Sequence, residues 1–396
     1  MKPPVLMIAY ACNPEGGGEH WLGWGWAEQA AKHYNVHLIS TPNARAQIEK
    51  HAPRHGITPH FVEQPKASRW GRKIGWQKRV LKVAAELHAR ERFQIVHQTT
   101  FHTFRVPFLA SSLGIPSVWG PVAGGESVPP GFSHDLGSAK FEELGRKLVN
   151  NVWLMHPQIR KSLANVGAMF VSNRTTMNFL PTSVHGKCVV VPPNALRPED
   201  EQYPEPQLRP NGDTFHLIYV GNCVATRALP IVFDALRRAK LPATKLTVVG
   251  AGTALERWKT LAADLVASGE VEFTGSVTRD RLPELYGRSH VLVFPAMRDS
   301  GGSALLEAMA RGVPVVCLDW GGPGEMVDAD SGVKIPVGTR DETVLNFAAA
   351  LIRLRESAEL RLRLARAARA RAVKLFKWDA RAELLRQTYE RLRSVK

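Results

Sequence analysis

Short apolar runs alternate with longer amphipathic segments along most of the chain. Near the N-terminus the order is VLMIAY, WAEQAAKHY and VHLIS, and further on it is QIVHQ, FRVPFLASSL and PSVWG. The short runs are rich in β-branched residues and favour strands, whereas the segments between them have helical spacing. The alternation predicts βαβ units, in which parallel strands form a sheet covered by helices.

A second series of this kind begins after residue 214 and runs from FHLIYVG through KLTVVGAG and VLVFP to VPVVCLD. Between the two series lies NALRPEDEQYPEPQLRPNGD, whose proline and polar content is typical of a linker. We therefore predict an α/β fold of two Rossmann-like domains that face each other across a cleft. The N-terminal domain would span residues 1–198 and the C-terminal domain residues 212–375. Residues 376–396 have helical spacing and are predicted to pack back on the first domain as a terminal helix.

Composition and charge narrow the class of protein. The 396 residues are 44% hydrophobic and 22% charged, which is typical of a globular chain. The four cysteines include no C-x-x-C pair, which favours a reducing compartment over a zinc or disulfide framework. No apolar segment reaches about 18 residues, so we expect a cytoplasmic protein. The net charge of +16 attracts anions, and residues 66–92 alone carry nine Lys or Arg against two Glu. No nucleic-acid motif accompanies this charge, so no nucleic acid is expected as a partner.

One stretch combines a strand, a glycine-rich turn and a helix. VLVFP supplies the strand, residues 299–303 the turn, and ALLEAMARG the helix. Ligands of parallel sheets bind beyond the carboxyl ends of strands, where backbone N–H groups and a helix N-terminus favour phosphate. The alternative is that Gly301 and Gly302 only make a tight turn and that Glu307 complements the helix dipole.

This stretch resembles the acidic motif of the retaining GT-B glycosyltransferases of family 4 (glycosyl transferases group 1). In that family a glutamate, a Gly-rich loop and a second glutamate eight positions later precede a segment similar to AMARGVPVV. Asp299 and Glu307 have this spacing here. The resemblance continues in YVGNCVATRAL, VVGAGTALERW and VEFTGSVTRDRLPELYGRSHVLVFP, and it spans about residues 215–340.

The resemblance implies roles for particular residues in the second domain. Glu307 would bind the ribose of a nucleotide-sugar, Asp299 the transferred sugar, and Arg227 the phosphates. The sequence departs from the family at Asp299, which is one methylene shorter than glutamate, and at Asn222, which replaces a phosphate-binding arginine. The candidate catalytic residues are Asp299, Arg227 and His97, and the candidate donor-binding residues are Glu307, Ser300, Gly301, Gly302, Ser303, Gly221, Asn222, Gly250 and Gly252.

In the first domain the resemblance is looser. AYACNPEGGGEHW resembles the Gly-rich loop that faces the diphosphate and the acceptor, although a flexible turn is the plain alternative. QIVHQTTFH places two histidines at a strand end, where a lone histidine is more often structural. PSVWGPVAGGES stands where many members have a further histidine. The candidates for the diphosphate and acceptor are Gly16, Gly17, Gly18, His102 and Glu126.

The resemblance implies a retaining hexosyltransferase that uses a nucleotide-sugar and needs no metal or cofactor, and the basic stretch favours a lipid-linked saccharide as the acceptor. IGWQKRVLKVAAELHA suits the anionic inner face of a membrane as a basic amphipathic helix; the alternative is a domain helix that buries Trp76, Val80, Val83, Ala84 and Leu87 on the sheet. Rival functions are a nucleotide-sugar epimerase or phosphorylase, a non-catalytic basic binding protein, and an inactive family member. The base, the sugar, the acceptor and the oligomeric state stay open.

Overall fold

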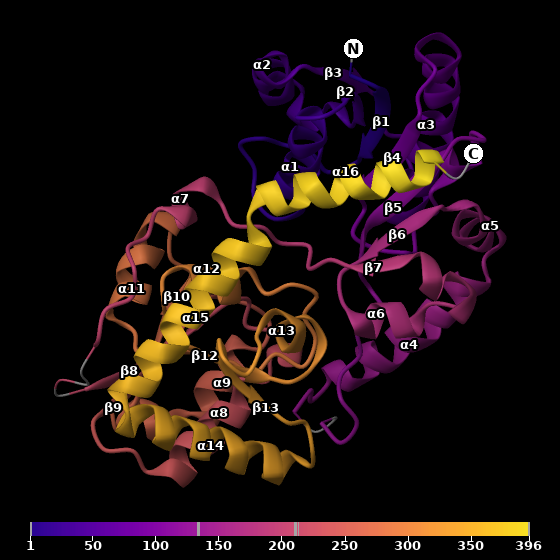
Figure 1. The fold of residues 1–396 in the computed structure, drawn as a ribbon. Helices are drawn as coiled ribbons and strands as arrows, with labels where there is room; N and C mark the ends of the chain where they lie inside the picture. The colour runs from indigo at the N-terminus through magenta and orange to yellow at the C-terminus, as the bar shows by residue number, and fades with distance from the viewer. Residues whose placement is uncertain (1, 133–134, 210–211, 213, 395–396) are drawn as a thin grey trace. The chain divides into compact units, whose positions relative to one another are not determined.

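The computed structural model describes residues 2–132, 135–209, 212 and 214–394, which form two compact units (Figure 1). The first unit contains Met1–Gly125, Lys147–Ala195 and Trp378–Lys396. The second contains Glu126–Arg146 and Leu196–Lys377. Each unit is built around one parallel sheet, and the α/β class is confirmed. Residues 126–146 belong to the second unit, although the predicted boundary placed them in the first.

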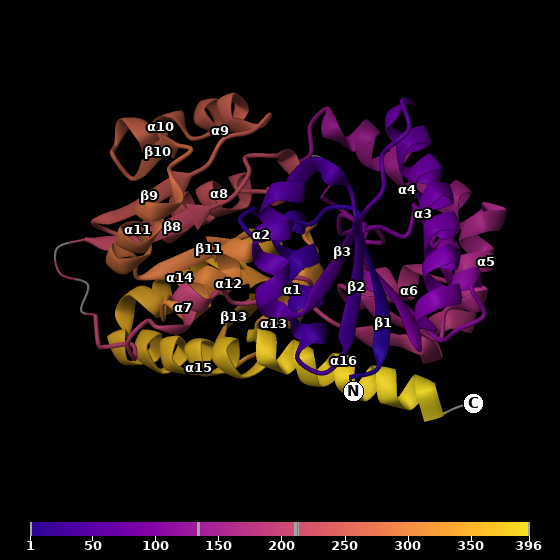
Figure 2. The ribbon, with the colours of Figure 1, turned by 90° about the horizontal axis from the view of Figure 1, so that it is seen from above.

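The sheet of the first unit has seven strands in the order β3-β2-β1-β4-β5-β6-β7. Alternate residues of β1 face two different cores, one beneath α1, α2 and α16 and the other beneath α3 and α5. Figure 2 shows α1 and α2 on one side of this sheet and α3 on the other. The elements are β1 (Pro4–Ala9), α1 (Glu19–Ala31), β2 (Asn35–Ser40), α2 (Arg45–His55), β3 (Ile57–Phe61), α3 (Arg69–Glu91), β4 (Ile95–Thr100), β5 (Ser117–Val122), α4 (Ala139–Met155), α5 (Pro157–Asn165), β6 (Ala168–Val171), α6 (Arg174–Phe179), β7 (Cys188–Val190) and α16 (Trp378–Ser394). Helix α4 starts in the second unit and continues into the first.

The sheet of the second unit has six strands in the order β10-β9-β8-β11-β12-β13. One core lies under α8, α9 and α14, and the other under α11, α12 and α15. The elements are α7 (Pro198–Glu201), β8 (Phe215–Val220), α8 (Pro230–Ala239), β9 (Thr244–Val249), α9 (Leu255–Leu261), α10 (Ala263–Ala267), β10 (Val271–Gly275), α11 (Leu282–Arg288), β11 (Val291–Phe294), α12 (Ser303–Ala310), β12 (Val315–Leu318), α13 (Gly321–Met326), β13 (Gly332–Ile335), α14 (Arg340–Glu356) and α15 (Ala358–Phe376).

Helix α3 is a domain helix, not a membrane helix. The Ser68 side chain accepts a hydrogen bond from the backbone N–H of Gly71 and caps its start. Trp76 and the other apolar residues of its predicted face pack against the first sheet, while its basic side chains at residues 78, 79 and 82 are exposed. The protein core therefore covers the apolar face of α3, as the domain-helix alternative expects, whereas its basic face stays exposed.

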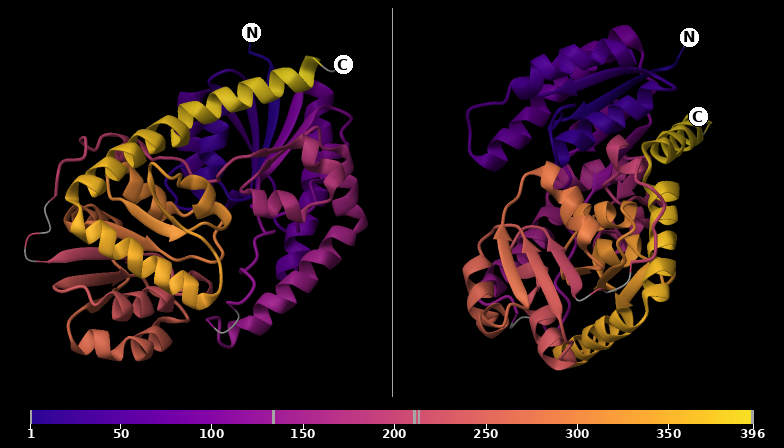
Figure 3. Two further views of the ribbon diagram at one scale, coloured as in Figure 1. Left: turned by 60° about the horizontal axis from the view of Figure 1, so that its bottom comes forward. Right: turned by 90° about the vertical axis from the view of Figure 1, so that its left-hand side faces the viewer.

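The C-terminal helix α16 returns to the first unit. It packs against α1, where Gly25 leaves room for the Trp378 ring: a Cβ there would lie 2.1 Å from a ring atom. Leu385 and Tyr389 are fully buried in the same core. Figure 3 shows α16, in yellow, after the end of α15. The terminal segment thus supplies part of the first unit's core.

Among the residues that the structure describes, no helix combines the length and the apolar character needed to cross a bilayer. The four cysteines are all free thiols.

Candidate functional site

The glycine-rich loop lies at the carboxyl edge of the second sheet, between β11 and α12. Gly302 precedes α12 with a left-handed φ of 39°, a conformation that glycine adopts without strain. The backbone N–H of Gly322, in α13, donates to the Asp299 carbonyl at 3.0 Å, and a Cβ at Gly322 would lie 2.6 Å from Ser300. The loop is therefore held against the start of α13 by a close backbone contact that only a glycine allows.

Asp299 and Arg227 form an ion pair beneath this loop. Arg227 ends a single 3-10 turn after β8, and its guanidinium meets the Asp299 carboxylate. The other carboxylate oxygen, Oδ1, accepts from the backbone N–H groups of Gly301 and Gly302, each at 2.8 Å. Both side chains are largely buried. The structure thus brings the two predicted residues together in one network of charge-assisted hydrogen bonds.

This network determines which backbone N–H groups of the loop are available to a ligand. Gly301 and Gly302 were predicted to cradle a diphosphate with their N–H groups, but in the structure both donate to Asp299. The shorter aspartate side chain folds back on its own loop in the manner of an Asx turn. Asp299 therefore occupies the same three donors, two amides and one guanidinium, that a phosphate group would use.

Glu307 lies on α12, in a mostly buried position surrounded by charged and aromatic groups. Its carboxylate is 3.8 Å from Arg279 and accepts from the Tyr286 hydroxyl at 3.4 Å. Burial raises the pKa of Glu307, and the positive charges of Arg279 and Arg311 oppose this effect. A carboxylate held here can accept hydrogen bonds from the hydroxyl groups of a ligand that enters from the carboxyl edge.

The sequence analysis did not predict that Arg311 and Asp200 lie beside Glu307. Arg311, one helical turn later, ion-pairs with Asp200 at 2.8 Å and lies over the Tyr203 ring. Asp200 was assigned to the linker, yet it is buried beside α12. Only the i, i+4 spacing of Glu307 and Arg311 was visible beforehand. The contact with Asp200 joins residues 111 positions apart, and no local pattern signals it.

The predicted glycines of the donor side pack two loops together. Gly250 follows β9 with φ 144°, and a Cβ there would lie 1.9 Å from the carbonyl oxygen of Gly221. A Cβ at Gly252 would lie 2.4 Å from the carbonyl oxygen of Cys223. Asn222 accepts a hydrogen bond from Tyr219 through its backbone carbonyl at 3.0 Å. These residues shape the edge of the sheet beside Arg227.

In the first unit, a second glycine-rich loop, residues 16–18, and His102 lie at the carboxyl edge of the sheet. Residues 16–18 follow β1, and Gly17 and Gly18 are exposed. Glu19, which opens α1, accepts from the backbone N–H of His102 at 2.8 Å. Burial lowers the pKa of His102, which favours its neutral form. The structure thus joins the loop after β1 to the segment after β4.

His97 has a structural position, and its proposed catalytic role is wrong. The ring is fully buried, with Nδ1 2.7 Å from the Tyr389 hydroxyl and Nε2 2.8 Å from the Gly120 carbonyl. Burial lowers its pKa to about 4, so it is neutral. Both ring nitrogens are engaged within the core, and neither can reach a substrate.

Glu126 belongs to the second unit and is buried. Its backbone carbonyl accepts from the guanidinium of Arg146, which also binds Glu143 at 2.8 Å. Arg298, next to Asp299 in the chain, approaches Glu143 at 3.4 Å. These contacts tie the segment around Glu126 to the start of the glycine-rich loop within one unit.

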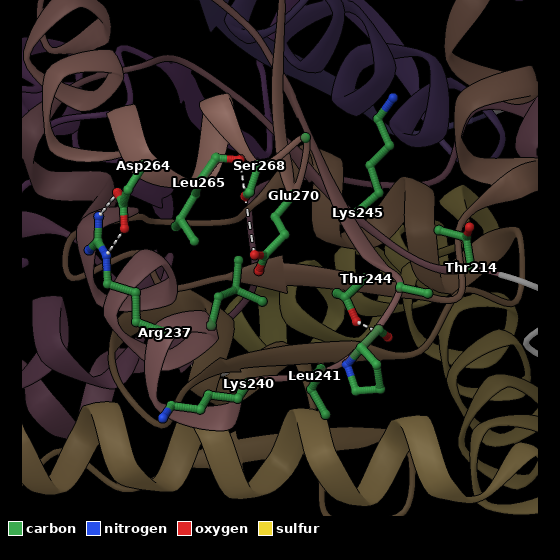
Figure 4. A pocket seen from close by; sticks show the side chains of 14 residues that line it. Thr214, Arg237, Lys240, Leu241, Thr244, Lys245, Asp264, Leu265, Ser268 and Glu270 are labelled. Carbon is green, nitrogen blue, oxygen red and sulfur yellow. Dashed lines mark hydrogen bonds and ion pairs between the residues drawn. The ribbon is translucent and has the colours of Figure 1, made fainter.

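Two further observations concern possible ligand sites. In the ranges that the structure describes, no group of three or more His, Cys, Asp or Glu side chains is arranged to hold a metal ion. A depression of about 720 Å³ lies at the amino edge of the second sheet, lined among others by Lys240, Lys245 and Glu270 (Figure 4). Its Arg237 and Asp264 side chains pair with each other at 2.6 Å. Because ligands of parallel sheets bind at the opposite edge, we assign this depression no role in the site.

Comparison with known proteins supports the glycosyltransferase hypothesis. Residues 201–371 match the family described as "Glycosyl transferases group 1". Sucrose-phosphate synthase from Thermosynechococcus elongatus has the same fold, with a TM-score of 0.69 and 19% identity over 100% of both chains. The chain has the GT-B fold of glycosyltransferases, and the segment that matches this family lies in its second unit.

The chain is similar to two curated glycosyltransferases, one of which is named for a nucleotide-sugar donor. It is 27% identical, over 64% of its length and 69% of the relative's, to the GDP-mannose-dependent alpha-(1-6)-phosphatidylinositol monomannoside mannosyltransferase of Mycobacterium tuberculosis. It is 35% identical, over 35% of its length and 31% of the relative's, to the D-inositol 3-phosphate glycosyltransferase of Streptomyces bingchenggensis.

Proposed function

We propose that this glycosyltransferase is a retaining hexosyltransferase that acts at the cytoplasmic face of a membrane on a lipid-linked saccharide. The observation that carries the proposal is the pairing of a buried carboxylate, Glu307, with a glycine-rich loop and the Arg227 guanidinium on one edge of one sheet. These are the groups needed to bind a ribose and a diphosphate side by side.

Each group has a separate task in the proposed reaction. Glu307 accepts hydrogen bonds from the ribose hydroxyls and orients the donor. Arg227 and the N–H groups of the loop stabilise the charge that develops on the leaving diphosphate. The acceptor hydroxyl attacks from the side on which the diphosphate leaves, and a departing phosphate oxygen takes its proton. The bond to the diphosphate breaks as the new glycosidic bond forms, so the configuration is retained and no protein nucleophile is required.

Asp299 gains a specific part in this scheme. Its carboxylate neutralises Arg227 and accepts hydrogen bonds from the loop amides. A diphosphate that binds the same donors must displace the carboxylate, which then becomes available to the hydroxyl groups of the transferred sugar. The predicted sugar contact thus stays part of the proposal, but it requires Asp299 to leave its present partners.

Two observations support a lipid-linked acceptor: the basic surface of α3 and the name of one relative. The basic face of α3 remains exposed although its apolar face is buried. The mycobacterial relative is named for a phosphatidylinositol mannoside, which is a lipid. A basic surface attracts a protein to anionic lipid by about 1 kcal/mol for each nearby Lys or Arg. We propose that these side chains keep the enzyme close to its acceptor.

The experiment that tests the function screens nucleotide-sugar donors and analyses the products. UDP-, GDP- and ADP-hexoses, each with and without EDTA, are offered with a lipid-linked saccharide, and the released nucleoside diphosphate and the anomeric configuration are measured. We expect one base to be preferred, retention of configuration and no effect of EDTA. Transfer with inversion would overturn the mechanism. Isomerised donor without transfer would favour an epimerase, and turnover only with added phosphate would favour a phosphorylase. Nucleotide binding without turnover would favour a binding protein.

A further inference from the structure

Helix α4 carries a continuous apolar stripe on its exposed side. Phe141, Leu144, Leu148, Val152 and Met155 each expose between 60% and 75% of their surface. At about 100° per residue these side chains fall within about 80° of the helix circumference, along about 21 Å of its length. In the part of the chain that the structure describes, eleven large hydrophobic side chains are exposed, and five of them belong to this stripe. A patch of this kind on an otherwise well-packed chain marks an interaction surface.

From Glu143 to Asn150 the inward side of α4 is polar, and only near its end do Trp153 and Leu154 pack against the core. Over these turns the amphipathic character of the helix is reversed. Asn150 is buried, donates to the Gly124 carbonyl at 2.8 Å and accepts from Arg105 at 2.6 Å. Glu143 and Arg146 pair on the same side one to two turns earlier. An ordinary surface helix turns its apolar stripe to the core and its polar face to water. Hydrogen bonds hold α4 in the opposite orientation, which leaves the stripe for a partner outside the chain.

Basic groups border the stripe. On the same helical projection, exposed Lys140 and Lys147 lie along one border, where their long side chains can extend past the apolar residues. Trp70, at the start of α3, packs against Trp153 of α4 with ring centroids 5.1 Å apart. The basic N-terminal turns of α3 therefore lie next to the helix that carries the stripe.

We propose that the α4 stripe inserts into the interface of an anionic lipid bilayer, with the lysines on the lipid headgroups. The inference rests on the proposed membrane association and names the surface responsible for it. An apolar face bordered by lysines fits such an interface. A second copy of the chain fits less well, because a two-fold contact through α4 would place the same lysines against each other.

The test is flotation of the full-length protein with vesicles of phosphatidylcholine, alone or with phosphatidylglycerol, at low salt. The variant Leu148→Gln/Val152→Gln removes apolar area from exposed positions. Its matched control, Leu261→Gln/Leu345→Gln, changes two exposed leucines of α9 and α14. We expect about a tenfold or greater loss of binding for the α4 variant and none for the control. Lys140→Gln/Lys147→Gln should lose about tenfold on anionic vesicles only.

The outcomes separate this inference from the proposed function. Binding of the wild type to neutral and anionic vesicles alike, or equal binding by the α4 variant, overturns it. Sedimentation equilibrium without vesicles gives the third outcome: a wild-type dimer that the α4 variant abolishes would assign the stripe to a second copy instead. Calorimetric nucleotide affinity of the same variants is measured alongside. If it is intact while vesicle binding fails, only the membrane surface is refuted and the donor site stands.

Discussion

The substitution Glu307→Gln should make the protein more stable and its donor binding weaker at the same time. The Glu307 carboxylate is about five-sixths buried, with 17% of the side chain exposed, and the Arg279 guanidinium lies 3.8 Å from it. Burial of a charge without a close partner is unfavourable, which is why the pKa of Glu307 is raised. Glutamine has the same shape without the charge, so it removes this penalty.

The pH dependence follows from the direction of the shift. A carboxyl whose pKa is raised by folding contributes stability below its ordinary pKa and loses that contribution as the pH rises through the folded value. At neutral pH the wild type therefore carries the penalty, and the glutamine variant does not. We expect a higher melting temperature for Glu307→Gln at pH 7 to 8, and a difference that disappears toward pH 4.

The loss of donor affinity can be estimated from the hydrogen bonds proposed for the ribose. A hydrogen bond to a charged acceptor contributes about 1.5–3 kcal/mol, against about 0.5–1.5 kcal/mol for a neutral one. Replacing the charge in two such bonds costs about 2–3 kcal/mol, which is a factor of about 30 to 150 in nucleotide affinity. Glu307→Ala removes both bonds and should weaken binding further.

The assay pairs calorimetry of nucleoside diphosphate binding with thermal unfolding across the pH range. Glu356→Gln, at an exposed position at the end of α14, controls for the loss of one negative charge. Unchanged nucleotide affinity in Glu307→Gln would refute the ribose contact. A lower melting temperature at pH 7 would refute the claim that burial, and not the neighbouring arginines, dominates the energy of this carboxylate.

Three further predictions concern other residues of the two units. Asp299→Asn removes the charge that competes for Arg227. It should tighten nucleoside diphosphate binding by about a hundredfold, because two charges about 5 Å apart interact by about 3 kcal/mol at an effective dielectric of 20. Weaker binding by calorimetry would contradict the competition. His97→Ala should lower the free energy of urea unfolding by about 2–4 kcal/mol, because buried partners lose their hydrogen bonds, and a changed nucleotide affinity would restore a role at the site. Gly250→Ala should lower the melting temperature sharply because its Cβ meets backbone, whereas Gly287→Ala, in open space on α11, should not; equal effects would contradict the close contact.

Much of the fold follows from local pattern. The apolar runs of the strands are buried on both faces, as a parallel sheet covered by helices requires. The spacing of Asp299 and Glu307 predicted one loop and one helix at a strand end, and the structure places both residues there. This was possible because a strand, its turn and the next helix are contiguous in sequence.

The rest depended on contacts that sequence does not display. Asp299 was expected to reach outward, but whether a short carboxylate prefers its own loop amides depends on the loop geometry. The membrane hypothesis chose α3 because its amphipathic pattern is strong, yet that pattern describes equally well a helix on a sheet. Helix α4 was not singled out in the sequence, because the contacts of the buried Asn150 with Gly124 and Arg105 join distant residues that no local pattern connects.

The return of α16 to the first unit has a consequence for synthesis on the ribosome. The core around Trp26 and Tyr34 includes Trp378, Leu385 and Tyr389, which are made long after the strands that they cover. A nascent chain that has completed the seven-stranded sheet still lacks this cover until about 200 further residues have been added, which takes about 10–40 s at typical elongation rates. The second unit, which is made before α16, therefore has time to fold before α16 packs against the first unit. A chain that terminates before residue 378 would expose an aromatic surface where the helix belongs, and would be a substrate for chaperones and proteases.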